Sequence, residues 1–265
     1  MCRFAMTLYY SISITCYNCD MKKVKVLQLN VWTGRIKGAL LDFFENNKFD
    51  VICLQEAIWS DNQLLEFFAA SVEQIKEASG LVNESRAANW DIDALGAKVF
   101  QGNVILTRER IVNEEIKTVH GEYSTVKSDL DLYEHCYKAQ IVTLESGLNI
   151  LNYHGYWQKD PLGNETTISV MEKVAEMAKK ATGPLVMCGD LNITSASPAM
   201  RKLDFLKDLT HVYDIDNTLS GLKFLGKVPC DHILVNDSVK VLNFEVEERI
   251  VSDHKALTCE LEVLN

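Results

Sequence analysis

The sequence has few of the residues that fibrous, disordered or membrane-spanning chains require. Only 4 of its 265 residues are proline and 13 are glycine, which excludes collagen, mucin-like stalks and most intrinsic disorder. No stretch approaches the roughly 18–20 consecutive apolar residues of a spanning helix, so we expect no transmembrane segment. Because 47% of the residues are hydrophobic, the chain can build a sizeable core.

Positive charge is also scarce. The sequence contains 27 Lys and Arg residues against 37 Asp and Glu residues, which gives a formal net charge of −10. A protein that coats nucleic acid through bulk positive charge is therefore not expected. An enzyme that cleaves a phosphodiester remains compatible with this charge, because bound divalent cations invert the local field of an acidic cleft.

The eight cysteines are too sparse for a disulfide scaffold in a chain of this length. Cys53, Cys188 and Cys259 lie within apolar, strand-like runs, where a free thiol behaves as a small buried hydrophobe. Cys16 and Cys19 form a single C-x-x-C without a second pair or a histidine at zinc-site spacing, so we do not expect a metal site there. This usage favours a reducing, cytoplasmic setting.

The first 20 residues do not resemble the rest of the chain. They are weakly apolar, carry one early Arg and have no clear small-residue cleavage site, so a signal peptide that would direct secretion is poorly supported. We interpret residues 1–20 as an N-terminal extension that is either disordered or the product of an over-long start. Residues 21–265 are predicted to form one domain, because no Gly/Ser/Pro-rich linker divides them.

Strand-like and helical patterns alternate along this domain. Apolar runs predict strands at residues 24–32, 50–57, 103–108, 140–145, 149–155, 184–192, 232–236, 242–248 and 254–263. Helical spacing of apolar residues predicts helices at residues 38–46, 61–79 and 165–182. Some strands follow one another without an intervening helix, which is typical of two mixed sheets packed face to face with helices outside.

Polar residues stand where several of these apolar runs end or begin. They are Asn30, Glu56, His154, Asp190, Asn192, Asp231, Asp253 and His254. A buried amide or carboxylate is costly unless it is paired or binds a metal. Each residue alone has a structural explanation, such as a turn, a helix cap or a hydrogen-bonded histidine. Their repetition at so many strand ends instead favours a common site.

The types of residue in this set restrict the chemistry. The sequence has no G-x-S-x-G elbow, no H-E-x-x-H and no Gly-rich loop of the Walker or dinucleotide type, which disfavours esterase, zinc protease, kinase and dehydrogenase functions. Carboxylates and amides dominate, and these ligands suit Mg²⁺ or Mn²⁺ better than zinc. A His beside an Asp can activate water, and Asn amides can stabilise charge on phosphate oxygens. The inventory indicates metal-assisted hydrolysis of a phosphate ester.

In their order along the chain, these segments resemble the endonuclease/exonuclease/phosphatase superfamily. That superfamily includes repair nucleases, pancreatic deoxyribonuclease, deadenylases, inositol polyphosphate 5-phosphatases and neutral sphingomyelinases. The similar segments are VLQLNVW, DVICLQEA (family pattern D-x-x-x-L-Q-E), GNVILTR, PLVMCGDLN (G-D-x-N), CDHILVN (D-x-I) and VSDHKAL (S-D-H). The resemblance covers nearly all of residues 24–265 and implies a four-layer α/β/β/α sandwich of two mixed β-sheets flanked by helices.

The resemblance also implies a metal site and a set of catalytic roles. Glu56 and Asp253, together with Asn30, would hold Mg²⁺, with Mn²⁺ as the alternative. Asn30, His154 and Asn192 would bind the phosphate of the substrate.

Two residues compete for the role of general base in this resemblance. Asp190 would position or deprotonate the attacking water, while His254, oriented by Asp231, would act as the base or stabilise charge on phosphorus. Because such coupled groups titrate as a unit, the choice between Asp190 and His254 stays open. His232, next to Asp231, is expected to lie at the surface.

The substrate is less determined, because this fold serves many substrates. Few Lys/Arg clusters are present, so a large duplex-binding footprint is not expected. Trp32 and Trp59 follow two of the predicted site strands. They could stack a base or hold a lipid head group, and a role in the core or in a lid is an equal alternative.

We predict a monomeric Mg²⁺-dependent phosphodiesterase, with nuclease activity on DNA or RNA as the leading hypothesis. The alternatives are a phospholipid or sphingomyelin-type phosphodiesterase and a small-molecule phosphatase acting on inositol phosphates or nucleotides. A catalytically silent binding module is disfavoured, because such a module typically loses its metal and base residues, whereas they all remain here.

Overall fold

A computed structural model describes residues 23–94, 96–127, 136–223 and 226–264. The expectations for residues 1–20, including Cys16 and Cys19, lie outside these described residues. No helix among the described residues is long and apolar enough to cross a membrane.

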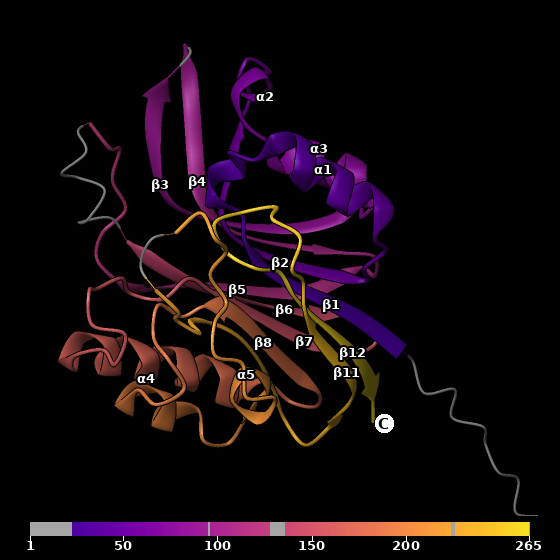
Figure 1. Cartoon of the computed structure of the whole chain (residues 1–265), viewed down its shortest axis with the longest axis vertical. Coiled ribbons are helices and arrows are strands. Elements are labelled where there is room, and N and C mark those ends of the chain that lie inside the picture. Colours follow the sequence, from indigo (N-terminus) through magenta and orange to yellow (C-terminus); the bar gives the residue numbers. More distant parts are fainter. Residues whose placement is uncertain (1–22, 95, 128–135, 224–225, 265) are drawn as a thin grey trace, which may run out of the picture.

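Two six-stranded mixed sheets form the centre of the molecule (Figure 1), with strand orders β11-β12-β1-β2-β4-β3 and β5-β6-β7-β8-β10-β9. The first sheet contains β1 (Lys23–Asn30), β2 (Val51–Ser60), β3 (Asn83–Ala94), β4 (Ala97–Thr107), β11 (Val239–Val246) and β12 (Leu257–Val263). The second contains β5 (Ile111–His120), β6 (Tyr137–Leu144), β7 (Asn149–Tyr153), β8 (Leu185–Asp190), β9 (Lys207–Asp208) and β10 (Asp231–Val235). In each sheet one pair is parallel, β1 with β2 and β7 with β8, and the remaining pairs are antiparallel.

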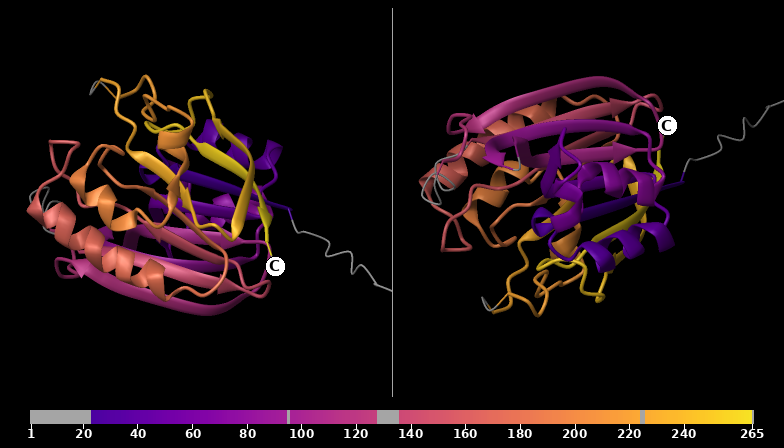
Figure 2. Two further views of the ribbon diagram at one scale, coloured as in Figure 1. Left: turned by 90° about the horizontal axis from the view of Figure 1, so that it is seen from below. Right: turned by 90° about the horizontal axis from the view of Figure 1, so that it is seen from above.

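Helices cover the outer faces of both sheets (Figure 2). The outer face of the first sheet is covered by η1 (Trp32–Gly34), α1 (Lys37–Asn46), α2 (Leu65–Phe68) and α3 (Val72–Ser79). The second is covered by α4 (Glu165–Lys180) and η3 (Pro198–Leu203). Leu209 of α5 (Leu209–Val212) packs instead in the apolar cluster between the sheets. The predicted four-layer α/β/β/α sandwich is therefore confirmed.

Three apolar layers hold these elements together, and each follows from the sequence pattern. Between the sheets, inward-facing residues such as Val26, Cys53 and Val186 form one buried cluster. Leu40 and Phe44 of α1, like Val170 and Val174 of α4, recur at helical spacing and pack against the outer faces. The described cysteines are free and buried, as expected of small core residues.

The prediction of one helix over residues 61–79 is wrong. Between α2 and α3 the chain is extended at Ala69 (φ −150°, ψ 164°), and the amide of Ala70 donates to the carbonyl of Gly34 (3.0 Å). Ser71 then caps α3 by accepting a hydrogen bond from the amide of Gln74 (3.2 Å). Phe68, which we expected on a buried stripe, is 70% exposed. A tertiary hydrogen bond and a helix cap thus override the helical periodicity.

The sequence pattern did not predict strands β3 and β5. In β3 the buried positions alternate as in any strand, but they are occupied by Ser85, Ala87, Asn89 and Asp91, so the apolar signal is absent. Strand β5 lies at the edge of its sheet and is largely exposed. Because neither segment shows alternating apolar residues, its sequence cannot be distinguished from that of a polar loop.

His232 is fully buried, so the expectation that it lies at the surface is wrong. Its Nδ1 lies 3.1 Å from a carboxylate oxygen of Asp208, and its Nε2 lies 2.9 Å from the carbonyl of Ile193. Burial lowers the pKa of His232, but the charge and hydrogen bond of Asp208 outweigh it and raise that pKa. Burial raises the pKa of Asp208, yet the contacts with His232 and Ser195 lower it overall.

We predict that Asp208→Asn lowers the free energy of unfolding by about 3 kcal/mol near pH 6, because it leaves one partner of a buried pair alone. The raised pKa of His232 stabilises the fold fully below its unfolded value of 6.5, and this contribution is lost as the pH rises through the folded pKa. The difference between wild type and variant should therefore shrink in alkaline solution.

Urea unfolding at several pH values measures this effect. Asp216→Asn is the matched control, since Asp216 pairs with Lys227 at the surface (72% and 71% exposed side chains) and should leave the stability unchanged. Equal stabilities of Asp208→Asn and wild type at pH 6 would contradict the assignment.

Candidate active site

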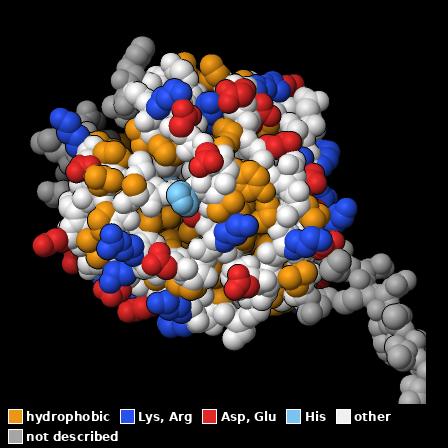
Figure 3. Space-filling model, turned by 60° about the horizontal axis from the view of Figure 1, so that its bottom comes forward, with side chains coloured by type: hydrophobic (Ala, Val, Ile, Leu, Met, Phe, Trp, Pro, Cys, Tyr) orange, Lys and Arg blue, Asp and Glu red, His pale blue; other side chains and the backbone are white. Residues whose placement is uncertain are grey.

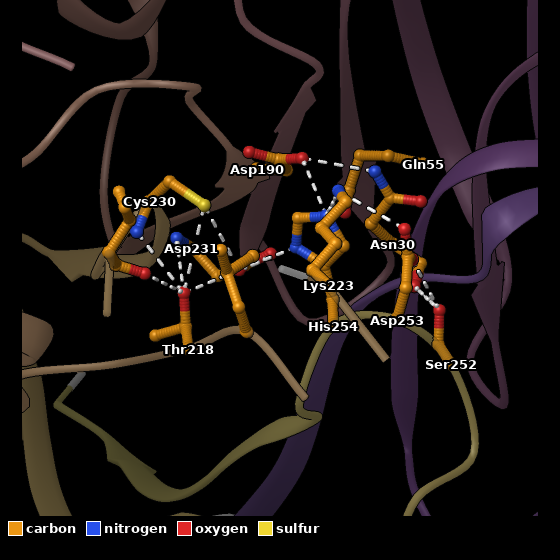
Figure 4. Close-up of polar contacts among 12 residues, drawn as sticks. Asn30, Gln55, Asp190, Thr218, Lys223, Cys230, Asp231, Ser252, Asp253 and His254 are labelled. Atoms are coloured by element: carbon orange, nitrogen blue, oxygen red, sulfur yellow. Dashed lines mark hydrogen bonds and ion pairs between the residues drawn. The ribbon is translucent and has the colours of Figure 1, made fainter. Parts of the chain in front are cut away.

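All eight polar residues predicted from the strand ends lie around one end of the sandwich. Asn30 ends β1, Glu56 lies in β2 and Asp190 ends β8, while Asp231 begins β10. His154 and Asn192 follow β7 and β8, and Asp253 and His254 precede β12. Hydrogen bonds or close ionic contacts connect seven of them to at least one other member, and Asp253 joins the group through Lys223. Figure 4 shows most of this group arranged around His254.

Strand register explains why residues so far apart in the sequence meet. In the parallel pair of β1 and β2, Asn30 is the partner of Gln55, which places Glu56 just beyond it. In the facing sheet, Asp231 and Asp190 are direct partners in the antiparallel pair of β10 and β8. The ends of β1 and β8 and the start of β10 therefore bring their polar residues to one rim. Glu56 does not end its strand as predicted, because β2 continues to Ser60.

A bulge directs Glu56 into the site. The pairing of β2 with β4 shifts between Leu54 and Ala57, and Glu56 has a φ of 52°, which is strained for any residue with a side chain. The bulge brings its Oε1 to 3.0 Å from Nδ2 of Asn30. Trp32, Thr33 and Asn192 also have positive φ values and line the same cavity, so backbone strain is concentrated at this site.

Asn30 connects the two sheets at the floor of the cavity. Its Nδ2 donates to Glu56 Oε1 and to Asp190 Oδ2, both at 3.0 Å. The other oxygen of Asp190 accepts from the amide of Asn192 (3.0 Å). His154 Nε2 lies 3.6 Å from Asp190 and 3.9 Å from Glu56. Two carboxylates, one amide and one imidazole thus converge on a small volume.

Asp190 is an almost fully buried carboxylate that stays ionised. Burial raises its pKa, but nearby His254, His154 and Lys223 and the hydrogen bond from Asn30 outweigh burial and lower the pKa to about 2. At neutral pH this group can accept a proton or a hydrogen bond from water.

Asp231 and His254 form a buried pair behind Asp190. Nδ1 of His254 lies 2.8 Å from Oδ2 of Asp231, and its Nε2 lies 3.5 Å from Asp190. Burial lowers the pKa of His254, but the two carboxylates outweigh it and raise the pKa to about 9. The nearby ammonium of Lys223 acts in the opposite direction. The imidazole is therefore fixed in orientation, with its Nδ1 facing Asp231. Its Nε2 accepts from the Lys223 ammonium (2.6 Å), so Nε2 can take up a proton only when that ammonium moves away.

Lys223 is the site residue that the sequence did not predict. It lies in the connection between α5 and β10, where no periodicity or motif identified it. Its Nζ is 2.6 Å from His254 Nε2 and 3.1 Å from Asp253 Oδ2. Burial lowers the pKa of Lys223, but Asp190, Asp253 and Glu56 raise it overall, so the side chain is an ammonium.

A buried amide network behind the site was also not predicted. Gln28 donates to Gln55 (2.8 Å) and to Asp231 (3.0 Å), and Gln55 donates to Asn152 (2.7 Å). These amides lie between the two sheets and fix Asp231 from behind. Each of these amides interrupts an apolar run in the sequence. This pattern does not distinguish them from ordinary polar residues of a strand.

The oxygen ligands at the rim fit a hard divalent cation. The ammonium of Lys223 already lies 3.1 Å from a carboxylate oxygen of Asp253, and the charges of Asp190 and Glu56 also favour it. Such oxygen donors suit Mg²⁺ or Mn²⁺. A second grouping of Asp190, Cys230, Asp231 and His254 has ligand atoms within 4.8 Å of one another. It fits a metal poorly, because burial raises the pKa of the Cys230 thiol and Asp231 is engaged with His254.

Aromatic side chains form the walls of the cavity, which has a volume of about 360 Å³. Trp32, Trp90 and Trp157 line it together with Tyr137 and Arg35, and the guanidinium of Arg35 lies 4.8 Å from the centre of the Trp32 ring. Of the two predicted alternatives for Trp32, its place in the cavity wall agrees with contact to a substrate. Trp59 does not line the cavity but stacks on Phe100 (5.9 Å between ring centres).

Residues 27–254 match the sequence model of the Endonuclease/Exonuclease/phosphatase family. Among curated proteins, none matches this sequence. Similar solved structures include an endonuclease/exonuclease/phosphatase from Beutenbergia cavernae (16% identity, TM-score 0.65, covering 92% of this chain and 72% of that one).

Two further similar structures have more specific descriptions. One is a mannosyl-6-phosphatase from Bacteroides thetaiotaomicron (17% identity, TM-score 0.59, covering 90% of this chain and 99% of that one). The other is the catalytic domain of human Nocturnin (15% identity, TM-score 0.57, covering 91% and 93%). At these identities the likeness shows the fold alone.

We predict that Asp231→Asn lowers the pKa of His254 by about 1–3, because an opposite charge in direct contact is removed. The pKa is measured from the NMR titration of the imidazole, whose signal is assigned by its loss in His254→Gln. Asp216→Asn, a change at an exposed carboxylate, is the control and should leave the titration unaltered. An unchanged pKa of His254 in Asp231→Asn would show that Asp231 does not determine the protonation of His254.

Proposed function

Because the chain belongs to the endonuclease/exonuclease/phosphatase family of phosphoester hydrolases, we propose that it is a Mg²⁺-dependent phosphodiesterase that cleaves single-stranded or terminal nucleotides of DNA or RNA. One observation carries this proposal: Glu56, Asp190, Asn192 and His154 line a cavity whose walls contain three tryptophans. Behind this lining, Asn30 and His254 contact Asp190 from buried positions.

In this proposal Glu56 and Asp253, with Asn30 beside them, hold the divalent ion. When bound, Mg²⁺ neutralises charge on the phosphate oxygens and so favours attack of water at phosphorus. Asn30 keeps Asp190 and Glu56 in position through its two hydrogen bonds of 3.0 Å.

Asp190 accepts the proton of the attacking water, since it remains a carboxylate with a pKa of about 2. When the ammonium of Lys223 leaves His254 Nε2, that nitrogen takes up a proton, which the raised pKa of about 9 favours, and His254 donates it to an oxygen of the pentavalent phosphorus. His154 and Asn192 bind the remaining phosphate oxygens, for which Asn192 exchanges its present hydrogen bond to the Gly155 carbonyl (3.0 Å). This assigns the role of base to Asp190 rather than to His254.

The cavity walls favour a substrate that carries flat rings. Three of the four tryptophans of the chain line the cavity, and stacking on aromatic side chains binds unpaired bases of any sequence. On the face drawn in Figure 3, basic and acidic side chains are interspersed without a continuous basic stripe. Together with a net charge of −10, this favours a strand end or single strand over a long duplex.

A sugar phosphate is the second candidate substrate. A cavity of about 360 Å³ lies at the small end of the range for small-molecule sites, and Arg35 could bind an additional anionic group. A similar solved structure is described as a mannosyl-6-phosphatase. Lipid substrates have weaker support, because neither the cavity nor its rim adds a feature specific to a head group.

A substrate panel tests the proposed function. We expect Mg²⁺-dependent cleavage of end-labelled single-stranded DNA or RNA that exceeds cleavage of the same sequence as a duplex, and EDTA should abolish it. Asp190→Asn should lower kcat by about 10²–10⁴-fold, the usual contribution of a general base, while Asp216→Asn should not. Hydrolysis of hexose phosphates, inositol phosphates or sphingomyelin with intact oligonucleotides would overturn the nucleic-acid assignment.

Trp157 provides a separate test of base stacking. Its side chain lines the cavity and is 51% exposed, so its truncation should not disturb the core. Trp157→Ala should raise KM for a single-stranded oligonucleotide by about 5–100-fold, the range expected for the loss of one base stack. Trp59→Phe, which changes a tryptophan outside the cavity, is the control. An unchanged KM in Trp157→Ala would argue against a stacked base at this wall.

A further inference from the structure

The cation already present in the carboxylate cluster is the side chain of Lys223. The side chain is 29% exposed and its Nζ lies 3.1 Å from Asp253 Oδ2 and 2.6 Å from His254 Nε2. Lys223 also lines the cavity together with Glu56, His154 and Asn192. The same ammonium therefore contacts the acidic floor and faces the space that a phosphate would occupy.

The backbone that carries Lys223 is tied to the catalytic segment. The amide of Ser220 donates to the carbonyl of Asp253 (2.9 Å), and the amide of Lys223 donates to the carbonyl of Ser220 (3.2 Å). Leu219 and His254 form an isolated antiparallel bridge. Because the start of this side chain is fixed beside the cavity, its flexible four-carbon stem can move the ammonium from Asp253 to a phosphate bound there.

The present position of the ammonium conflicts with a metal ion on Asp253. A divalent ion and a lysine ammonium repel each other strongly at contact distance in a partly buried site, so both cannot contact the same carboxylate oxygen. The free energy that binds the ion must therefore include the displacement of Lys223. A phosphate in the same cavity offers the displaced ammonium a new anionic partner.

We propose that Lys223 is a further catalytic residue, which occupies the carboxylate cluster in the metal-free protein and turns to a non-bridging phosphate oxygen of the substrate when a divalent ion takes Asp253. The inference rests on the proposed phosphoester hydrolysis, but not on which alcohol the phosphate carries. Lys223 then opposes metal binding and favours phosphate binding. Removal of Lys223 should therefore strengthen metal binding and weaken phosphate binding. Removal of a lysine with only a structural role would not produce this pair of opposite changes.

Calorimetric titration of Lys223→Met separates the two effects without using activity. Mn²⁺ or Mg²⁺ should bind the variant about tenfold more tightly than wild type, because a competing charge-assisted contact is gone. Inorganic phosphate, titrated in saturating Mg²⁺, should bind the variant about tenfold more weakly, because the same kind of contact to phosphate is lost. Lys223→Arg keeps the charge and should stay close to wild type in both titrations.

Two controls keep the result specific. Lys227→Met removes a nearby lysine that pairs with Asp216 at the surface and should change neither affinity. Lys223→Gln repeats the measurement if Lys223→Met does not fold, as judged by its unfolding transition in urea.

The proposal fails if the metal affinity of the Lys223 variant is unchanged or weaker than wild type, if phosphate affinity does not fall, or if wild type binds no divalent ion. The proposed nuclease function alone would be wrong if wild type leaves oligonucleotides intact while the metal and phosphate affinities of the Lys223 variant both change as expected. In that case Lys223 still binds phosphate, and the substrate is another phosphoester.

Discussion

The buried pair of Asp231 and His254 joins the two sheets and orients the catalytic groups at the same time. Asp231 begins β10 in one sheet and His254 precedes β12 in the other, and their side chains meet at 2.8 Å. A fully buried carboxylate is tolerated only when its oxygens are bonded, and Asp231 also accepts from Thr218 and Gln28. Separation of the sheets at this end would break these bonds. At this end of the molecule, the same interaction therefore holds the sheets together and orients the active site.

Residues with strained backbone conformations are concentrated at the rim of the sandwich that forms the active site. Glu56, Asn192, Trp32 and Thr33 have positive φ values, which is unfavourable for residues with a side chain. Their neighbours in β1, β2 and β8 are almost fully buried, so the strained residues are flanked by rigid strands. Ser252 adds a further constraint, because its hydroxyl donates to the carbonyl of Asn30 (2.7 Å). The packing of the buried strands therefore holds the strained residues of the site in position before a substrate binds.

The sequence predicted the residues of the site better than it predicted their environment. Glu56 and Asp190 stand out because they interrupt apolar strands, and strand ends at one edge of a sheet must lie close together. Lys223 gives no such signal, because its place depends on hydrogen bonds from Ser220 to Asp253, residues far apart in the chain. The break at Ala69 likewise depends on Gly34. Periodicity records which face of an element is buried, whereas such long-range polar contacts leave no local pattern.

Charge balance connects the site to the type of phosphate it can bind. Its four negative groups are the carboxylates of Glu56, Asp190, Asp231 and Asp253, and its own positive groups are His254 and Lys223. A divalent ion would bring this set to neutrality. A monoanionic diester then adds one uncompensated charge to a partly buried cavity, whereas a dianionic monoester adds two, and desolvated charge is costly. Arg35, beside Trp32 at the cavity wall, can offset one of these charges. On this balance the proposed diester substrate leaves less uncompensated charge in the cavity than a monoester does.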